Sequence, residues 1–250
     1  MSHNNCWGPT VDVREHQSDC LICSQKLEYL KVSKRLKCIN CNKEEYGNIV
    51  CVEGHYICDE CHGKKYFEAV LELIIKSKGT NPFYITRDII DLAKLPMLGC
   101  EHTWVVSGAL MISIKNAGFD IDDKDVLEAI NRTRKQSIGG YCGLSGICGI
   151  SVSIGTVFSV LLGAGCPKDT ETRTTMKVVA KVVDAIADQT GPCCCKNFSY
   201  TALEIACEEL KEKLNIVLDS NNDIICDNSN EHPHGCIKER CNYFGTRLRS

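Results

Sequence analysis

The sequence lacks an excess of charge of either sign. Its 29 lysine and arginine residues nearly balance its 32 aspartate and glutamate residues, and the net charge is −3. This balance gives no electrostatic case for a nucleic acid partner or for an acidic membrane surface. The composition is otherwise that of a globular protein, with 24% charged and 44% hydrophobic residues. A chain of 250 residues is long enough for one large domain or two modest ones.

The N-terminal residues lack the apolar segment of a secretion signal. We therefore expect a cytoplasmic protein, in a reducing compartment where structural disulfides are rare and thiolates bind metals. This expectation decides how the 19 cysteines of the chain are interpreted. Many of them stand in short-spaced pairs, which suit one shared ion better than cross-links between distant segments. The cysteines therefore predict metal sites, with zinc as the expected metal.

Charged residues are also missing from 136–167, a run long enough to span a bilayer. Eight glycines interrupt the run, together with serines and three cysteines. Its first half is too polar to be a good insertion sequence. We therefore predict a buried helix preceded by a glycine-rich loop, and no membrane span.

Helical periodicity dominates the chain after residue 63, whereas no alternating run supports a large sheet. Apolar residues recur at helical spacing in seven segments: 66–78, 86–95, 101–117, 126–134, 149–162, 170–188 and 199–218. The predicted fold is mainly α, with a helical domain preceded by a small metal-binding module. We expect a polar arm (1–19), a Cys/His zinc-binding module (20–63), the α-helical domain (64–218) and a Cys/His-containing tail (219–250).

The module contains four pairs of candidate metal ligands. In chain order they are Cys20 with Cys23, Cys38 with Cys41, Cys51 with His55, and Cys58 with Cys61. Two cysteines separated by two residues fit a turn in which both sulfurs reach one tetrahedral ion. Eight ligands are enough for two closed zinc sites. Few large apolar residues accompany them, so we expect the module to fold around metal.

The order of these pairs resembles the cross-brace zinc modules of RING and PHD domains, in which alternate pairs share an ion. The resemblance implies two sites: Cys20, Cys23, Cys51 and His55 in one, and Cys38, Cys41, Cys58 and Cys61 in the other. Three alternatives remain open. His62 can replace Cys61 or His55, one zinc ribbon can use only the first two pairs, or a cluster can take the place of zinc. Closed sites of this kind are structural by default.

The helical domain carries cysteines in three unusual segments. These are 99–102 (GCEH), 139–149 (GGYCGLSGICG) and 191–197 (GPCCCKN). Glycine lets the backbone curl around a ligand, and a helix N-terminus favours a thiolate or an anionic iron–sulfur cluster. We therefore predict a second site that holds a [4Fe–4S] cluster. The candidate ligands are Cys100, Cys142, Cys148, Cys193, Cys194 and Cys195.

The alternative for the helical domain is that its cysteines are buried small hydrophobes. That interpretation suits Cys166 and Cys207, but three successive sulfurs at 193–195 serve no purpose in packing. The tail adds Cys226, Cys236 and Cys241 with two histidines. These residues allow either a third zinc site or a tail without fixed structure.

The three segments resemble an uncharacterised cysteine-rich domain family of archaea and anaerobic bacteria. Its pattern reads approximately GPEHH, CGxxGxCG and GPRCCKR, after a stretch like 54–62 of this chain (GHYICDECH). The resemblance extends over about residues 20–206 and implies a family without an assigned function. This sequence departs from the pattern at Cys100, Thr103, Cys193 and Asn197. Members are often labelled methyltransferases, but this chain has no glycine-rich strand-to-helix nucleotide motif.

A weaker likeness relates residues 192–197 to the Pro-Cys-x-x-Arg-Asn segment of iron–sulfur-dependent serine dehydratases. The small-residue helix after Cys142 is also similar to the Gly-Cys helix of those enzymes. In that family three cysteines hold a [4Fe–4S] cluster, and one iron stays open as a Lewis acid. The likeness implies a triad of Cys142, Cys148 and one cysteine of 193–195, with Cys100 as a fourth candidate.

The candidate catalytic residues are Glu101, His102 and Cys194. His102 is a candidate base or ligand, although a lone histidine that opens a helix is more often a capping or surface group. We expect a thiolate–metal enzyme that acts on a small molecule by sulfur transfer, elimination or reduction. One alternative is a zinc module that binds protein or RNA, which basic residues at 31–37 favour. Another is a carrier that delivers metal or sulfur to a partner enzyme.

Overall fold

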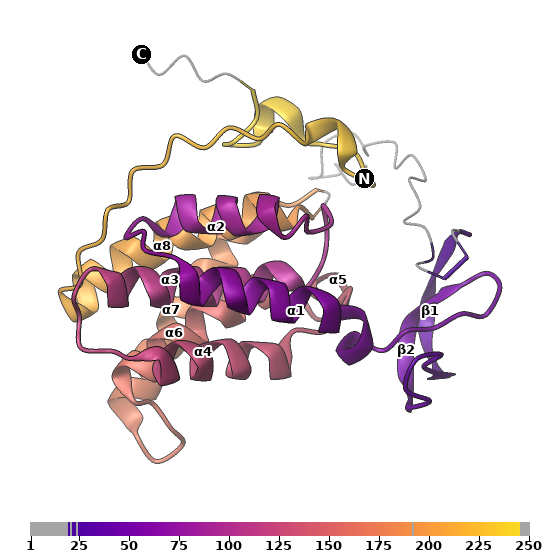
Figure 1. Cartoon of the computed structure of the whole chain (residues 1–250), viewed down its shortest axis with the longest axis horizontal. Helices are drawn as coiled ribbons and strands as arrows, with labels where there is room; N and C mark the ends of the chain where they lie inside the picture. Colours follow the sequence, from indigo (N-terminus) through magenta and orange to yellow (C-terminus); the bar gives the residue numbers. More distant parts are fainter. Residues whose placement is uncertain (1–19, 21, 24, 192, 246–250) are drawn as a thin grey trace, which may run out of the picture.

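A computed structural model describes residues 20, 22, 23, 25–191 and 193–245, so the predicted arm at 1–19 lies outside the described residues. Within them a two-stranded sheet precedes eight α-helices, and the mainly α fold is confirmed (Figure 1). The elements are β1 (Leu27–Lys37), β2 (Glu44–Cys51), α1 (Asp59–Lys76), α2 (Pro82–Leu92), α3 (Glu101–Asn116), α4 (Asp123–Gln136), α5 (Tyr141–Ser145), α6 (Gly149–Leu162), α7 (Asp169–Ala187) and α8 (Cys195–Leu214). Two short 3-10 helices, η1 (Ser229–Glu231) and η2 (Lys238–Arg240), follow in the tail.

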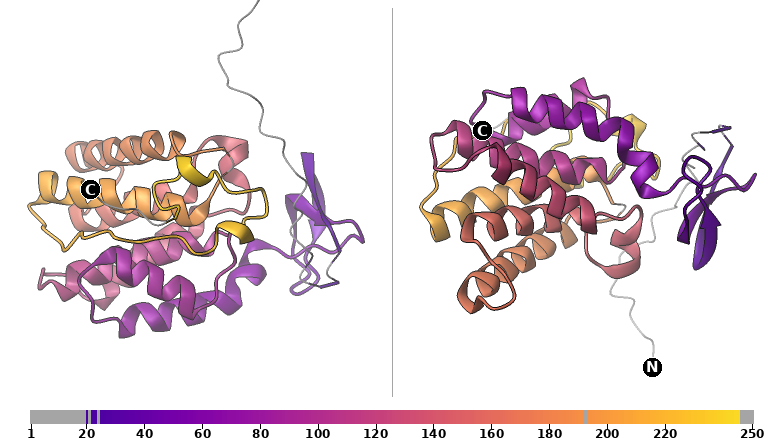
Figure 2. Two further views of the ribbon diagram at one scale, coloured as in Figure 1. Left: turned by 90° about the horizontal axis from the view of Figure 1, so that it is seen from above. Right: turned by 60° about the horizontal axis from the view of Figure 1, so that its bottom comes forward.

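Strands β1 and β2 form an antiparallel hairpin that projects from the helical body (Figures 1 and 2). Leu27 pairs with Cys51 at one end, and Lys37 pairs with Glu44 at the other. Most residues of β1 are exposed, and β2 is buried only at its end. The hairpin therefore has almost no apolar core. This explains why periodicity does not predict it, and why it needs another source of stability.

Helix α3 lies at the centre of the helical body, in contact with α1, α2, α4, α6 and α8. All of its residues from Glu101 to Ile114 are buried. Neighbours on every side leave α3 without a polar face, unlike an amphipathic surface helix. Helix α4 is of the amphipathic kind and begins with a capping box, in which Asp122 and Asp125 each accept a backbone N–H of the other.

Several helices begin earlier than their periodicity predicts. Helix α1 begins at Asp59. Periodicity does not predict this start, because the first turns of α1 are polar and carry metal-ligand types instead of an apolar stripe. Helix α2 begins at Pro82, where the Asn81 side chain accepts hydrogen bonds from two backbone N–H groups. Helix α8 covers Cys195–Leu214 instead of 199–218, and ends where Asn215 adopts a left-handed conformation with φ of 54°.

The uncharged run at 136–167 folds as a short helix followed by a buried one. Helix α5 is an addition to the prediction, and Gly140 and Gly146 flank it with φ of 72° and 76°. Helix α6 covers the predicted 149–162, and its first half is buried. None of the helices in the described part of the chain combines the length and the apolar character needed to cross a bilayer.

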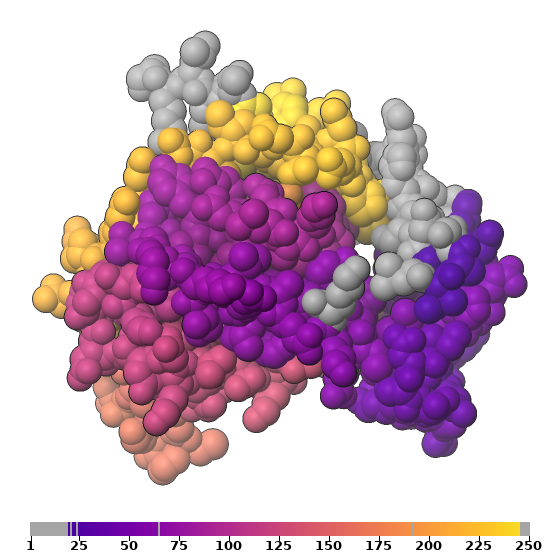
Figure 3. All heavy atoms as spheres, in the orientation of Figure 1, coloured from indigo at the N-terminus to yellow at the C-terminus, as the bar shows by residue number. Residues whose placement is uncertain are grey.

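The tail runs back over the helical body as a strap (Figure 2). Asn81 donates a hydrogen bond to the Asn221 carbonyl at 2.9 Å, and Tyr84 donates to the Asp223 carboxylate at 2.7 Å. Further on, the Cys226 N–H bonds the Tyr243 carbonyl at 2.7 Å. In the space-filling view the tail packs directly on the helices (Figure 3). Residues 219–245 are thus an ordered part of the structure.

Gly108 of α3 provides a test of the close packing between α1, α3 and α4. A Cβ there would stand 2.2 Å from Ile74 Cδ1 and 3.2 Å from Ile130 Cδ1, and both isoleucines are fully buried. We expect Gly108→Val to lower the free energy of unfolding by about 1–3 kcal/mol through overpacking. Urea denaturation measures this change.

The matched control is Met176→Val, on the exposed side of α7. It introduces the same β-branched residue into a helix without a clash, so its effect should stay below about 1 kcal/mol. Equal effects of the two substitutions would contradict the described packing.

Candidate metal centres

The first group of candidate ligands joins the start of the module to the end of β2. Cys20, Cys23, Cys51 and His55 place one ligand atom each within 4.8 Å of the others. The Cys23 and Cys51 sulfurs are 3.5 Å apart, and His55 Nδ1 lies 3.2 Å from the Cys23 sulfur. Thiolates that bind one zinc at about 2.3 Å stand roughly 3.8 Å apart at tetrahedral angles. The group therefore has the spacing of a tetrahedral zinc site.

The second group joins the turn between the strands to the start of α1. Cys38, Cys41, Cys58 and Cys61 also lie within 4.8 Å of one another, with 3.6 Å between the Cys41 and Cys58 sulfurs. Cys38 and Cys58 are completely buried. Burial raises the pKa of Cys38, but backbone N–H groups outweigh it and hold the pKa at about 6. A thiolate stabilised in this way is ready to bind a metal ion.

The two groups combine alternate pairs, which is the arrangement that the cross-brace order predicts. A single ribbon of the first two pairs does not form, because these pairs lie in different groups. His62 belongs to neither group. Its Nδ1 lies 3.2 Å from the Glu101 carboxylate, and this partner raises the pKa of His62. Two Cys-rich groups that can hold a metal ion are thus present in the module.

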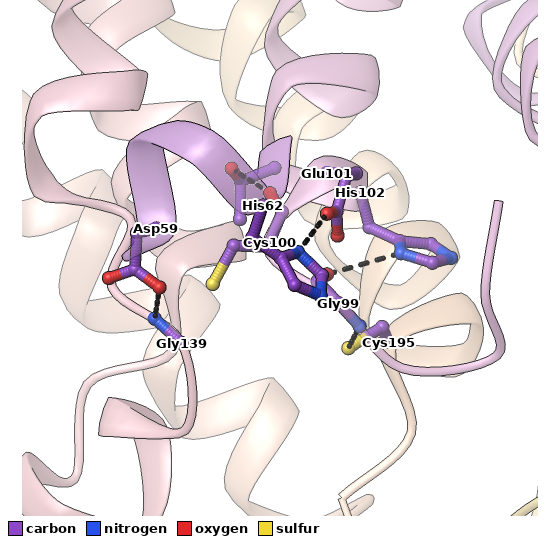
Figure 4. Close-up of polar contacts among 9 residues, drawn as sticks. Asp59, His62, Gly99, Cys100, Glu101, His102, Gly139 and Cys195 are labelled. Carbon is purple, nitrogen blue, oxygen red and sulfur yellow. Dashed lines mark hydrogen bonds and ion pairs between the residues drawn. The ribbon is translucent and has the colours of Figure 1, made fainter. Parts of the chain in front are cut away.

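Helix α1 connects the second group to the helical body. Cys58 is its N-cap residue, so the metal ligands Cys58 and Cys61 belong to its first turn. The other side of that turn faces the helical domain, where Asp59 accepts a hydrogen bond from Gly139 N–H at 3.3 Å (Figure 4). A Cβ at Gly63 would stand 2.4 Å from the Trp104 ring, so glycine is needed where α1 meets α3.

Five cysteines from three distant segments come together in the helical body. This five-thiol group consists of Cys100, Cys142, Cys148, Cys193 and Cys195. The Cys195 sulfur accepts a hydrogen bond from Gly99 N–H at 3.5 Å. An interaction with the Cys193 thiol lowers the pKa of Cys142 to about 6. Burial, together with the charge of Cys142, raises the pKa of Cys148 to about 11 and also raises that of Cys100.

The starts of three helices carry these thiols. Cys100 and Cys148 are the N-cap residues of α3 and α6, and Cys195 is the first residue of α8. A Cβ at Gly149 would stand 2.9 Å from Thr103 Cγ2, so this glycine lets α3 and α6 approach closely. Helix starts have free N–H groups and a positive dipole end. The helix starts therefore bring free backbone donors to the five-thiol group, whereas burial and neighbouring negative charges raise the pKa of every thiol in it except Cys142.

Cys194 is the exception among the predicted cluster ligands. It is the N-cap of α8, and its sulfur faces the tail instead of Cys142 and Cys148. Burial, followed by the charges of Cys226 and Cys241, raises its pKa to about 11. Successive residues at a helix start point in different directions. Cys193 and Cys195 therefore lie in the five-thiol group, and Cys194 lies beside the tail.

The two other predicted catalytic residues also differ in position. Glu101 is buried beside Cys100, with one carboxylate oxygen on His62 and the other without a partner among the described residues. Burial lowers the pKa of His102 to about 4, and its Nδ1 lies 3.2 Å from the Gly99 carbonyl. In Figure 4 the His102 ring extends away from Cys100 and Asp59. Glu101 therefore lies at the five-thiol group, and His102 is a buried group behind it.

Asp59 is a residue of this site that the sequence analysis missed. Besides burial, the charge of Asp59, together with those of Glu101 and two thiols, raises the pKa of Cys100. Burial raises the pKa of Asp59 itself. The available signal was its position directly after the ligand Cys58, inside the first turn of α1.

Zinc analysis of Cys38→Ser tests the module. A closed site lends its binding energy to folding, so loss of one buried ligand should remove about one zinc ion per chain and make the hairpin sensitive to protease. Cys166→Ser is the matched control, since Cys166 is exposed and belongs to neither group. An unchanged zinc content in Cys38→Ser would contradict the grouping.

Comparison with known proteins adds a family to this description. No curated protein matches the chain, and no solved structure does. One protein family matches over residues 70–244, which include all of the helical body except the first turns of α1, and its description reads "Family of unknown function (DUF5714)". This match agrees with the expected uncharacterised family. Since it covers most of the sequence, the chain belongs to the DUF5714 family.

Proposed function

We propose that this is an iron–sulfur protein whose five-thiol group binds a cluster, and whose zinc module holds the cluster domain in place. The observation that supports the proposal most strongly is the meeting of three cysteine-bearing helix starts. Residues 99–100, 142–148 and 193–195 are far apart in the sequence, yet their thiols interact directly or electrostatically. Thiolates are the usual ligands of iron–sulfur clusters.

The spacing of the sulfurs favours a cluster over a single ion. In the described structure no three of the five sulfurs lie within 4.8 Å of one another, unlike the ligands of the two module groups. A cluster places iron and sulfide between its thiolate ligands, so it requires a wider arrangement than one ion.

Backbone donors beside the group suit a cofactor of negative charge. The Gly99 N–H donates to the Cys195 sulfur, and Cys100 and Cys148 stand at the N-terminal ends of α3 and α6. Hydrogen bonds to cluster sulfurs tune the reduction potential of such cofactors. The glycine-rich loop brings its backbone close, where larger side chains would block the approach.

The adjacent acid and base groups suggest an enzyme. Burial and the charges of the Asp59 and Glu101 carboxylates raise the pKa of Cys100, and the partly exposed His62 pairs with the buried Glu101. Carboxylates beside a cofactor can hold or move a proton of a bound small molecule. A bound cluster would supply either electrons or a Lewis-acidic iron. Reduction, elimination and sulfur transfer are therefore the candidate reactions, and the likeness to serine dehydratases favours elimination.

Anaerobic purification tests this proposal through the variant Cys142→Ser/Cys148→Ser. We expect the native protein to be coloured, and the variant to lose about four iron atoms per chain with an equal amount of sulfide. Its zinc content should not change, because neither cysteine belongs to the module groups.

The matched control is Cys166→Ser/Cys207→Ser, which removes one exposed and one half-buried thiol outside the five-thiol group. It should keep its iron and its colour. An iron content that is the same in both double variants would rule out a cluster at this site.

A second candidate function is recognition of a partner enzyme by the zinc module. The hairpin exposes apolar side chains, with Val32 76% and Tyr46 74% exposed, beside the basic residues of β1. Exposed apolar residues on a rigid hairpin are typical of protein interaction surfaces. We expect Val32→Asp/Tyr46→Asp to keep the native metal content but to fail in complementing a deletion of the gene. Full complementation would remove this candidate.

A further inference from the structure

A cavity of about 70 Å³ lies between the tail and the start of α8. Four cysteines line it, and they come from two parts of the chain: Cys194 from the start of α8, and Cys226, Cys236 and Cys241 from the tail. None of the four belongs to the module groups or to the five-thiol group. The cavity is therefore a separate site, with its own set of thiols.

Polar contacts fix the tail against the segment that carries Cys194. His232 Nε2 donates to the Cys193 carbonyl at 3.0 Å, and Arg240 donates to the Gly191 carbonyl at 3.1 Å. Lys196 Nζ donates to the Asn228 side chain at 2.5 Å. These bonds on both sides of Cys194 hold the four cysteines around one space.

Backbone N–H groups donate to two of the four sulfurs. The Lys238 N–H donates to Cys236 at 3.3 Å, and the Tyr243 N–H donates to Cys241 at 3.4 Å. In both cases the donor lies two residues after the cysteine. Interactions with the backbone of Asn197 and Lys196 lower the pKa of Cys194, and an interaction with that of Asn228 lowers the pKa of Cys226, although burial outweighs them.

The module ligands show the same hydrogen bond. Cys20 accepts from Ile22 N–H at 3.4 Å, and Cys51 accepts from Glu53 N–H at 3.3 Å. Turns of this kind present a thiolate to a metal and stabilise its charge. Cys236 and Cys241 thus share a local geometry with cysteines of a candidate metal-binding group. Asn197 adds a side-chain donor to the Cys241 sulfur at 3.0 Å.

His232 lines the cavity but is not available as a ligand. Its Nε2 bonds the Cys193 carbonyl, and its Nδ1 accepts from the His234 N–H at 3.2 Å. Both ring nitrogens are therefore used in positioning the tail. The ligand set of the cavity consists of four cysteines.

We propose that Cys194, Cys226, Cys236 and Cys241 bind an iron–sulfur cluster of the [4Fe–4S] class. Four cysteines are the complete ligand set of such a cluster. In the described residues no three of these sulfurs lie within 4.8 Å of one another, and the cavity separates them. This spacing distinguishes the site from the module groups, where sulfurs stand 3.5 and 3.6 Å apart. The charged side chains that line the cavity balance one another, with Arg87 and Lys196 against Asp91 and Asp227.

The proposal goes beyond the cluster of the five-thiol group and does not depend on it. The two sites meet at residues 193–195, where Cys193 and Cys195 face one and Cys194 faces the other. Each site can therefore be removed separately.

The test is anaerobic purification of the full-length variant Cys226→Ser/Cys241→Ser, followed by measurement of iron, sulfide and zinc. We expect a loss of about four iron atoms per chain relative to the native protein, with zinc unchanged. Unchanged iron would overturn the proposal, as would a loss of one zinc ion without loss of iron. Cys166→Ser/Cys207→Ser is again the matched control.

The comparison with Cys142→Ser/Cys148→Ser separates the two sites. If that variant keeps all of its iron while Cys226→Ser/Cys241→Ser loses it, the proposed function fails and the tail site stands. The reverse result removes the tail site alone.

A second variant covers the case in which Cys226→Ser/Cys241→Ser does not fold. Cys236→Ser changes one ligand on the outer loop of the tail, and retained zinc shows that the module is intact. A serine oxygen in place of a thiolate should alter the electron paramagnetic resonance spectrum of the reduced protein. An unaltered spectrum would overturn the proposal.

Discussion

The continuity of a metal-ligand turn with helix α1 is the constraint on which the rest of the structure depends. The hairpin buries almost nothing, and two Cys-rich groups that can hold a metal ion connect its ends to the rest of the chain. Cys58 and Cys61 of the second group are also the N-cap and first turn of α1. The same turn contacts the glycine-rich loop through Asp59 and the start of α3 through His62. An ion bound by the second group would thus fix the loop that carries Cys142 and Cys148.

Cysteines at helix starts are the second recurring feature. Cys58, Cys100, Cys148 and Cys194 are the N-cap residues of α1, α3, α6 and α8, and none of them makes a side-chain capping bond. Serine, threonine, aspartate or asparagine would cap these helices better. Cysteine at these positions therefore lowers the local stability of each helix. A role of these cysteines as ligands explains why they stand there. The N–H groups that remain free at these helix starts can donate to an anionic ligand bound there.

Local spacing made some features predictable. The pairs of the module lie close in the sequence, and their cross-brace grouping follows from their order. Helix α6 and the bounds of α3 followed from apolar periodicity, but the burial of α3 on every side did not. The hairpin was not predictable in this way, because its exposed residues carry no alternating pattern of burial.

Other features depend on tertiary contacts that no local pattern records. The direction of Cys194 depends on where α8 begins, which is four residues before its apolar periodicity. The tail folds through isolated hydrogen bonds such as that between Cys226 and Tyr243, so its three cysteines could not be assigned to a common site from spacing alone. The role of Asp59 could not be predicted, because it depends on the contact between the first turn of α1 and Gly139.

The most direct test of the account is anomalous X-ray scattering from anaerobically grown crystals, measured at the iron and zinc absorption edges. The account predicts one zinc peak in each of the two module groups, and iron peaks at the five-thiol group and in the tail cavity. Zinc peaks at all of these positions, with no iron, would contradict the central claim that the thiols of the helical body bind iron–sulfur clusters.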